Sequence, residues 1–213
     1  ARMAAQLDHP NAVTVYDAGR TLSGGVYVVS QFIDGRTLEA EIREGRLTEQ
    51  ETVRLLIPVA RALHAAHQRK IIHRDVKPAN ILISREGRIP FVADFGLAIH
   101  GDRHPAAYAI AGTPAYMSPE QARGNEADAR SDQFSFGLVL FELLAGKRAF
   151  QKDSAAQTMA AIVEAEPDWS ALASTPPALR WILERCLSKE PRDRYDSTGD
   201  LARDLEQLKR RQS

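Results

Sequence analysis

The stretch from Phe134 to Leu144 is apolar on nearly every side. A helix on the surface of a domain carries its apolar residues in one stripe, whereas a helix that is apolar all round lies in the interior. The chain is therefore expected to fold around a central buried helix. Its 213 residues, 44% of which are hydrophobic, are sufficient to build a sizeable core around that helix.

The rest of the chain divides into a short strand-rich part and a longer helical part. Residues 1–7 have the pattern of the end of a helix, and two strand-like runs, 12–18 and 26–32, are joined by a turn rich in Gly and Ser. From residue 35 onward helical patterns dominate, apart from short strands and loops expected over residues 71–98.

One helix carries its own start signal. Thr48 and Glu51 have the spacing of a capping box, which begins a helix that continues to about His67 and is expected to kink at Pro58. Other helices are predicted from apolar residues at helical spacing, over 38–44, 155–166, 178–187 and 199–209.

The charge balance and the single cysteine restrict the classes of function. There are 28 Lys and Arg and 28 Asp and Glu residues, so no global field directs the chain to nucleic acid or to anionic lipid. Cys186 stands alone, which excludes an internal disulfide framework and suits a reducing, cytoplasmic compartment. No apolar run approaches the ~20 residues that span a bilayer, and the first residues do not form a signal peptide.

Two segments, 73–80 and 94–96, hold the polar residues that transfer of a phosphoryl group requires. Asp75 can orient a hydroxyl group and accept its proton, and Lys77 can place a positive charge at the transferring phosphate. Asn80 and Asp94 offer oxygen atoms, the ligands that Mg²⁺ prefers. Turn-capping Asp and Asn residues are the plain alternative, but the order and spacing of the four favour a site.

A second motif spans residues 112–120 with the sequence GTPAYMSPE. The Thr113 hydroxyl can hydrogen-bond to both Asp75 and Lys77, which would join a platform for the substrate to the loop that carries these two residues. This platform disfavours a small-molecule phosphotransferase, which can share the acid and amide motif.

Several residues that attract notice are expected to be structural. His64 and His67 should lie on one helix face and His73 should pack in the core, because no further ligand follows at the spacing of a zinc site. Cys186 is expected to be a small buried hydrophobic residue, and Trp181 to pack in the core or between helices.

In the order and spacing of these motifs the chain resembles the protein kinase superfamily, specifically a bacterial-type serine/threonine kinase, over essentially its whole length. The resemblance implies an α+β, protein-kinase-like fold. Residues 1–33 would be a residual N-lobe with the end of a helix, two strands and the hinge. Residues 34–213 would be a mainly helical C-lobe with the catalytic loop and the activation segment. The implied function is ATP-dependent phosphorylation of Ser and Thr hydroxyls on protein substrates, with Mg²⁺ as cofactor.

The resemblance also implies roles for single residues. The implied catalytic residues are Asp75, Lys77 and Thr113, the metal ligands Asn80 and Asp94, and the nucleotide contacts Gln31, Ile33, Leu82, Asn80 and Asp94. Asp132 would hold the backbone of the catalytic loop, and Glu120 would form an ion pair with Arg194. Ser30 would be the gatekeeper beside the adenine.

The main departure from the family pattern concerns the nucleotide. The glycine-rich loop, the strand lysine and the helix glutamate that pairs with it are missing from the 213 residues. We therefore expect an N-terminally truncated chain that is nearly inactive, because loss of one such charge donor can lower the rate by ~10²–10³. A pseudokinase or docking module that binds protein partners without catalysis is the alternative. Retention of the four polar residues of the two segments favours an enzyme for the parent protein.

The activation segment is a second departure. From Leu97 to Gly112 there is no Ser or Thr, and Tyr108 is the only hydroxyl-bearing residue. Arg74 stands where the family commonly binds a loop phosphate, so the sequence predicts a kinase that ordinary loop autophosphorylation does not switch on. Asp102 is a candidate permanent partner for Arg74. The substrate protein, the activating signal and the oligomeric state are left open.

Overall fold

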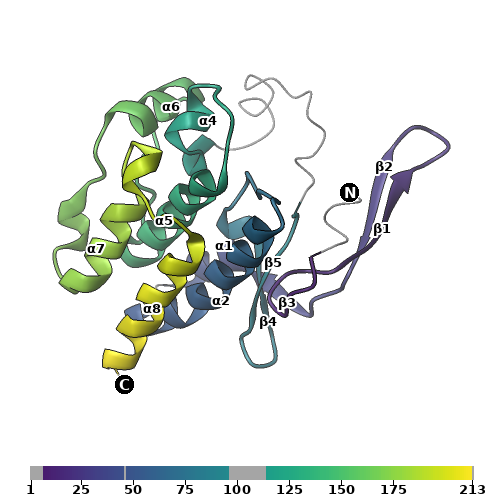
Figure 1. The fold of residues 1–213 in the computed structure, drawn as a ribbon, viewed down its shortest axis with the longest axis horizontal. Coiled ribbons are helices and arrows are strands. Elements are labelled where there is room, and N and C mark those ends of the chain that lie inside the picture. Colours follow the sequence, from purple (N-terminus) through teal and green to yellow (C-terminus); the bar gives the residue numbers. More distant parts are fainter. Residues whose placement is uncertain (1–6, 46, 96–113, 213) are drawn as a thin grey trace.

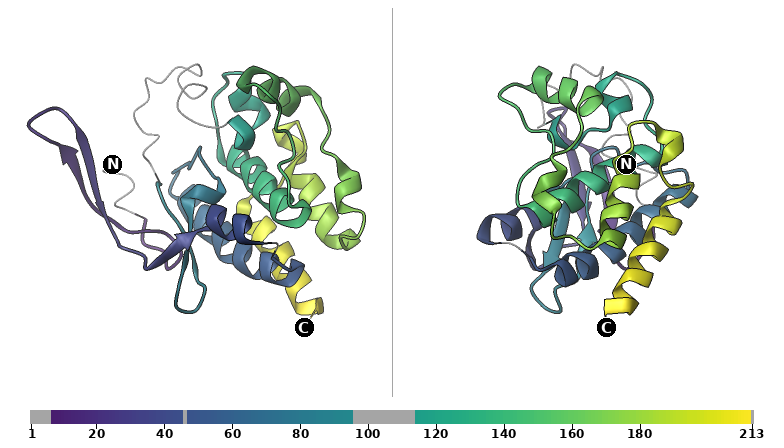
Figure 2. Two further views of the ribbon diagram at one scale, coloured as in Figure 1. Left: turned by 180° about the vertical axis from the view of Figure 1, so that it is seen from behind. Right: turned by 90° about the vertical axis from the view of Figure 1, so that its left-hand side faces the viewer.

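The computed structural model describes residues 7–45, 47–95 and 114–212, with the backbone alone for residue 212 (Figure 1). The helix end expected over residues 1–7 therefore falls almost wholly outside the described residues. Two parts are plain in Figures 1 and 2: a group of helices with a small sheet beside it, and a two-stranded hairpin that projects away from them.

The projecting hairpin consists of β1 (Val15–Arg20) and β2 (Val26–Ser30), which pair in an antiparallel arrangement. In the turn between them, Gly24 adopts a φ of 85° and its N–H donates to the Thr21 carbonyl at 2.9 Å. Glycine adopts this left-handed conformation without steric penalty. The two strands expected over 12–18 and 26–32 are confirmed; the second begins where predicted, and the other three ends differ by two or three residues.

A second, three-stranded antiparallel sheet lies at the side of the helices. Its strands, in spatial order, are β3 (Gly35–Thr37), β4 (Ile81–Ser84) and β5 (Pro90–Val92). Thr37 lies opposite Leu82. The N–H of Val13 donates to the Val92 carbonyl at 2.8 Å, and this bond joins the base of the hairpin to the sheet.

The first two helices, α1 and α2, span Leu38–Glu44 and Glu49–Gln68. The predicted capping box of α2 is confirmed: the Thr48 hydroxyl accepts from the Glu51 N–H at 3.2 Å, and the Glu51 carboxylate accepts from the Thr48 N–H at 2.8 Å. These two bonds satisfy donors that have no partner within the helix. The helix continues through Pro58 to Gln68.

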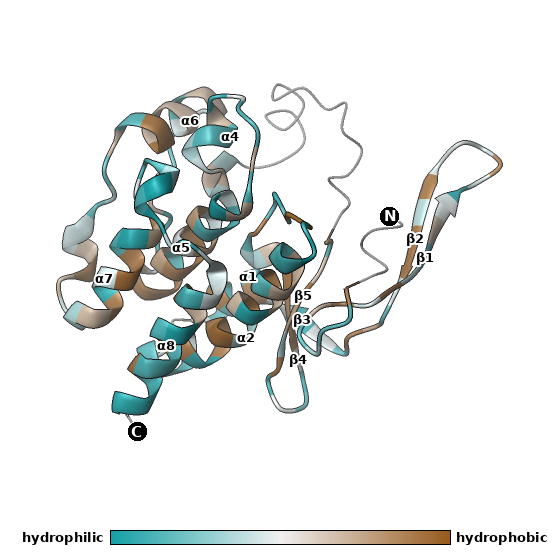
Figure 3. Ribbon diagram, viewed as in Figure 1, coloured by the Kyte–Doolittle hydropathy of each residue, from teal (hydrophilic) through white to brown (hydrophobic). Residues whose placement is uncertain are grey.

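The central helix expected around Phe134–Leu144 is α5 (Ala129–Ala145), and it is buried along most of its length. It contacts α2, α4, α7 and α8, and the apolar residues gather where these helices meet (Figure 3). Gly137 permits the close approach of α5 to α7, because a Cβ atom there would lie 2.8 Å from the Cβ of Cys186 on α7. Cys186 is buried, as predicted.

The remaining helices complete the helical group. They are α4 (Pro119–Ala122), α6 (Ala155–Glu164), α7 (Pro177–Cys186) and α8 (Thr198–Gln212), with short 3-10 turns η2 (Pro78–Asn80), η4 (Pro114–Tyr116), η5 (Trp169–Leu172) and η6 (Pro191–Asp193). The helices predicted near α6, α7 and α8 are confirmed. Trp181 on α7 is 53% exposed, so of its two expected places the core is wrong; its ring makes an edge contact with Tyr195, which precedes α8. Among the described helices, none has the length and apolar character needed to span a bilayer.

Candidate active site

The loop that carries the first polar segment, residues 71–80, connects α2 to β4. Lys70 and Arg74 have positive φ values of 60° and 67°, so the chain turns sharply before and within the loop. The N–H of Ile71 donates to the Ala66 carbonyl at 3.0 Å, which fixes the start of the loop on the end of α2. At its other end, η2 leads directly into β4. The loop is therefore held by regular structure on both sides.

The side chain of Asp132, in the first turn of α5, holds the backbone of the 71–80 loop through hydrogen bonds. Its side chain is fully buried, and its two oxygens accept from the N–H groups of His73 and Arg74, each at 2.8 Å. A ring nitrogen of His67 lies 2.7 Å from the same carboxylate. The prediction that Asp132 supports this loop is confirmed, and the negative charge also suits the N-terminal end of a helix.

Asp75, Lys77 and Asn80 are brought together at the surface of the loop. The Lys77 ammonium donates to Asp75 Oδ2 at 2.7 Å, and the Asn80 amide donates to the same oxygen at 3.0 Å. Asn80 also donates to the Asp75 backbone carbonyl at 2.8 Å. The Asp75 side chain is 50% exposed, so a substrate hydroxyl can reach it, and the exposed ion pair with Lys77 can rearrange at little cost.

Asp94 follows β5 and is placed beside Asn80. The N–H of Ala93 donates to the Asn80 carbonyl at 2.8 Å, and the Ala93 carbonyl accepts from Nε2 of His73, also at 2.8 Å. Asp94 itself has a φ of 63°, a conformation that Asp tolerates better than most residues. His73 is buried against the ring of Phe95, as expected for a core histidine.

Asn80 and Asp94 fit the role of ligands to Mg²⁺. The Asn80 nitrogen is engaged with Asp75, while Asn80 Oδ1 and the Asp94 carboxylate accept no hydrogen bond from the described residues. Such oxygens suit a hard cation that keeps several waters and substrate phosphates as its other ligands. Within the described ranges, no cluster of three or more His, Cys, Asp or Glu could hold a metal alone. Asn80 and Asp94 are therefore two candidate ligands for the ion among the described residues.

Three of the predicted nucleotide contacts lie in two places: Gln31 and Ile33 in the link between β2 and β3, and Leu82 on β4. The N–H of Gln31 already donates to the Thr14 carbonyl at 2.8 Å, so a nucleotide can hydrogen-bond to the backbone of Gln31 only at its carbonyl group. Ile33 is half-buried a short distance along the chain. Leu82 is half-buried in the middle of β4, between buried neighbours.

Other predicted residues lie outside the described part of the chain. They are Gly96, Asp102, Tyr108, Gly112 and Thr113. The proposed hydrogen bonds of Thr113 and the proposed pairing of Arg74 with Asp102 therefore remain predictions.

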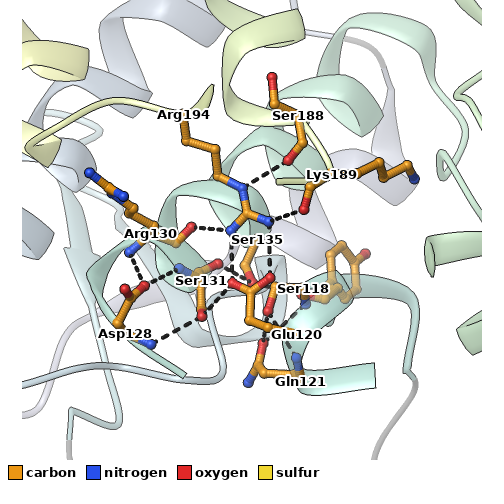
Figure 4. A network of polar contacts seen from close by, with 11 residues as sticks. Ser118, Glu120, Gln121, Asp128, Arg130, Ser131, Ser135, Ser188, Lys189 and Arg194 are labelled. Atoms are coloured by element: carbon orange, nitrogen blue, oxygen red, sulfur yellow. Dashed lines mark hydrogen bonds and ion pairs between the residues drawn. The ribbon is translucent and has the colours of Figure 1, made fainter. Parts of the chain in front are cut away.

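The predicted pair of Glu120 and Arg194 is confirmed, and it is the centre of a buried network (Figure 4). Two guanidinium nitrogens of Arg194 donate to the two Glu120 oxygens at 2.7 and 2.9 Å, and the Ser131 hydroxyl donates to Glu120 at 2.6 Å. Burial alone would raise the pKa of Glu120, but the hydrogen bonds and charge of Arg194 outweigh it and lower the pKa. The carboxylate is therefore held in its charged form.

Helix α4, which carries Glu120, is also tied to the 71–80 loop. Ser118 and Gln121 form a capping box at the start of α4, and the side-chain amide of Gln121 donates to the Arg74 carbonyl at 2.9 Å. This bond connects the predicted substrate platform to the residue directly before Asp75. Sequence reasoning missed Gln121: the spacing from Ser118 is that of a capping box, but the bond to Arg74, 47 positions earlier, has no local signal.

Two further polar groups near the site were not predicted. His67 was expected only on a helix face, yet it reaches Asp132. The buried Tyr116 hydroxyl donates to the Glu142 carboxylate and accepts from Arg148 at 3.2 Å. Burial, together with the neighbouring carboxylate, raises the pKa of Tyr116. The partners are far apart in sequence, so no local pattern could have indicated these contacts.

Comparison with known proteins agrees with this geometry. The chain matches the protein kinase domain over residues 1–205. It is 38% identical over 224 residues to a probable serine/threonine-protein kinase of Corynebacterium efficiens, and 37% identical over 222 residues to the serine/threonine-protein kinase PknB of Mycobacterium tuberculosis. These matches cover 99% and 96% of this chain but 34% of each relative, so the chain spans about a third of their length.

Solved structures show the same fold. The kinase domain of Mycobacterium tuberculosis PknI superposes with a TM-score of 0.78 and 28% identity, over 97% of this chain and 75% of that domain. The α+β, protein-kinase-like fold implied by the motifs is therefore confirmed. With its family match, its bacterial serine/threonine-kinase relatives and its fold in agreement, the chain belongs to the protein kinase domain family.

Proposed function

We propose that the protein containing this chain transfers the γ-phosphoryl group of Mg-ATP to Ser and Thr hydroxyls on protein substrates. The observation that carries the proposal is the convergence of Lys77 and Asn80 on one oxygen of an exposed Asp75, at 2.7 and 3.0 Å. A scaffold protein has no physical need for an acid, a cation and an amide in this arrangement. The similarity to serine/threonine-protein kinases supports the same reaction.

Each residue has a distinct task in this proposal. Asp75 orients the substrate hydroxyl and accepts its proton as the oxygen forms a bond to the γ-phosphorus and the bond to the ADP oxygen breaks. Lys77 leaves Asp75 to donate hydrogen bonds to the transferring phosphoryl group. Asn80 and Asp94 hold Mg²⁺, which when bound supplies charge neutralisation on the phosphates.

Preorganisation of the loop supports the same tasks. Asp75 follows directly after Arg74, whose N–H and carbonyl are both held, by Asp132 and Gln121 respectively. The Asp75 side chain is thus attached to a backbone segment that these two hydrogen bonds hold in place when the substrate binds. Displacements of about 1 Å at such a site can lower a rate ~100-fold, so this fixation matters for transfer.

Calorimetry with Mg-ATP tests the nucleotide and metal part of the proposal. We expect binding to the 213-residue chain, loss of binding in Asp94→Ala, and unchanged binding in Asp153→Ala, which alters an exposed aspartate away from the site. Absence of binding to the wild-type chain would contradict the proposal for this chain and would favour a docking module that binds protein partners.

A separate assay tests the rate. The 213 residues contain no G-x-G-x-x-G segment, so we expect this chain to phosphorylate a generic basic protein ~10²–10³ more slowly than an intact relative. A rate equal to that of the intact kinase would contradict this expectation. We further propose a cytoplasmic location for the domain, because the buried, unpaired thiol of Cys186 suits a reducing compartment.

A further inference from the structure

Glu41, on the inner side of α1, is an acidic residue in the interior of the fold. Its side chain is 6% exposed, which is uncommon for a carboxylate unless it is paired. Position 41 lies close in sequence to the predicted hinge, and none of the tasks proposed above for the active site uses it.

Two arginines from two other elements neutralise Glu41. Arg36, in the middle of β3, donates through Nε at 2.5 Å, and Arg88, in the β4–β5 turn, donates at 2.8 and 3.4 Å. Burial alone would raise the pKa of Glu41, but the hydrogen bonds from Arg88 and Arg36 outweigh it and lower the pKa. We call Arg36, Glu41 and Arg88 the ion triad. It joins α1, β3 and the β4–β5 turn through charge-assisted bonds.

The β3–β4 pairing that the triad spans is short, and it is also held by the close approach of Gly35 to the backbone of Ile83 and by the bond from the Arg85 N–H to the Asp34 carbonyl at 2.8 Å. Only three residue pairs form the ladder, with Thr37 opposite Leu82 and Arg36 opposite Ile83. A cavity of about 300 Å³ lies beside it, lined by Gly35, Arg36, Glu41, Ile83, Ser84, Arg85 and Arg88. Apolar packing therefore does not fill the place where β3, β4 and the turn meet.

A slip of this ladder would have a direct consequence. Moving one strand by a single residue exchanges the two faces of the sheet. Leu82, now half-buried and predicted to lie under the adenine, would exchange its place with the buried Ile83. The same slip would displace Arg88, in the β4–β5 turn, by about 3.3 Å relative to Glu41, which breaks its bonds to this buried carboxylate.

We propose that Glu41 is a positioning residue: through the ion triad it fixes the register of β3 against β4 and thereby places Leu82 at the nucleotide site. The placement of Leu82 at the nucleotide site rests on the proposed function, whereas the role of the triad in the β3–β4 register does not. Buried ionic groups often contribute little net stability, and defining register is the role best established for them. Glu41 meets that condition, because a pairing that removes Arg88 would leave the buried carboxylate with Arg36 as its remaining partner in the triad.

Nuclear magnetic resonance can read the register without nucleotide. We compare wild type, Glu41→Gln and the control Glu39→Gln, which removes an exposed pair with Arg43 on the same helix. In Glu41→Gln we expect loss of the cross-strand contacts between Thr37 and Leu82, and amide exchange about tenfold faster over residues 81–84. Glu39→Gln should match wild type. Wild-type contacts and exchange in Glu41→Gln would overturn the proposal.

A second variant keeps the test decisive if Glu41→Gln does not fold. The triple change Arg36→Met, Glu41→Leu and Arg88→Met replaces the triad by apolar groups, a kind of exchange that many proteins tolerate without loss of stability. We expect a folded protein with mixed or altered β3–β4 pairing. Retention of the single native register in this variant would show that the triad is not needed for it.

Calorimetry with Mg-ATP separates the register from the proposed function. If wild type binds and the register-defective variant binds at least about tenfold more weakly, the positioning role is supported. If that variant binds as tightly as wild type, the positioning role of Glu41 fails, although its role in fixing the β3–β4 register stands. If wild type itself does not bind, the nucleotide site and the positioning role fail together, and the resonance data alone decide the register.

Discussion

The side chains of His67 and Asp132, which are 65 positions apart in the sequence, are in direct contact: Nε2 of the histidine lies 2.7 Å from Oδ2 of the aspartate. The other ring nitrogen of His67 lies 2.9 Å from the Thr198 hydroxyl at the start of α8. One residue of α2 thus contacts both α5 and α8. Because Asp132 also holds the backbone of His73 and Arg74, this histidine indirectly supports the catalytic loop.

Removal of the His67 ring should therefore weaken the fold near the loop. We expect His67→Ala to lower the free energy of unfolding by about 1–3 kcal/mol, because the buried Asp132 carboxylate loses one of its three hydrogen-bond partners. Urea denaturation measures this value. The neighbouring change Gln68→Ala, at an exposed position of the same helix, should stay within about 0.5 kcal/mol of wild type. Equal values for the two variants would contradict the prediction.

The buried pair of Glu120 and Arg194 should be more sensitive. Glu120→Gln leaves a fully buried guanidinium without its counter-charge, so we expect a loss of about 3–5 kcal/mol in the free energy of unfolding. Glu126→Gln removes the same charge at an exposed position of the following loop and should have little effect. Urea denaturation near neutral pH compares the two. A loss below about 1 kcal/mol in Glu120→Gln would show that the network does not depend on the pair.

The same carboxylate predicts part of the acid sensitivity of the protein. The pKa of Glu120 is lower in the folded state than its ordinary value of 4.5, so the unfolded chain takes up its proton first as the pH falls. The contribution of Glu120 is thus fully present above about pH 4.5 and is lost as the pH falls through the folded-state value. We expect the stability difference between wild type and Glu120→Gln to shrink over this range, as measured by urea unfolding at successive pH values.

The sequence predicted elements whose signals are local. Thr48 and Glu51 define a capping box by spacing alone, and the helix predicted over residues 38–44 has those bounds in the structure. The buried α5 could be predicted because its apolar character needs no partner to be recognised. The four polar residues Asp75, Lys77, Asn80 and Asp94 were found through order and spacing, which are also properties of the sequence alone.

The contacts that sequence reasoning missed are long-range and polar. Glu41 on the amphipathic α1 gives no sign that two arginines will bury it, and His67 gives no sign of Asp132. Such pairs depend on how the helices cross, which periodicity does not encode. Trp181 shows the opposite error: a large apolar residue on a helix was expected in the core or between helices, but its side chain is 53% exposed and contacts Tyr195 and Arg185.

Lys189 should titrate far below an ordinary lysine. Its ammonium lies 4.1 Å from the centre of the Phe150 ring and donates to the Ile162 carbonyl at 2.7 Å. The pKa of Lys189 falls from 10.5 to about 8, chiefly because the side chain is buried; the charge of Glu166 opposes this shift, and the charges of Arg123 and Arg194 add to it. Between pH values of about 8 and 10.5, the unfolded chain binds more protons at Lys189 than the folded chain does. The contribution of this site to the free energy of unfolding therefore rises with pH.

A matched pair of variants tests the titration of Lys189. Raising the pH from 7.5 to 9.5 should stabilise wild type by about 1 kcal/mol relative to Lys189→Met, after allowance for the partial exposure of the side chain. Lys152→Met, at an exposed position, should follow wild type instead. Urea denaturation at the two pH values gives the difference. An unchanged gap between wild type and Lys189→Met would place the pKa of Lys189 near its ordinary value.

The projecting hairpin should make the chain prone to self-association. All five residues of β2 are exposed, and four of them are Val or Tyr. The chain also exposes Tyr16, Leu22 and Phe32 in the same region. An uncharged strand with an unpaired edge is a template for pairing with another chain, and a lysine on such a strand opposes that pairing. Val28→Lys should therefore reduce association.

Light scattering over a range of protein concentrations measures this effect. We expect the apparent mass of wild type to rise with concentration, and that of Val28→Lys to stay near 23.6 kDa over the same range. Gln207→Lys adds the same charge on the exposed side of α8, far along the sequence from β2, and should associate like wild type. If Gln207→Lys is as effective as Val28→Lys, net charge rather than the strand edge governs association, because a general charge effect does not depend on where the lysine is placed.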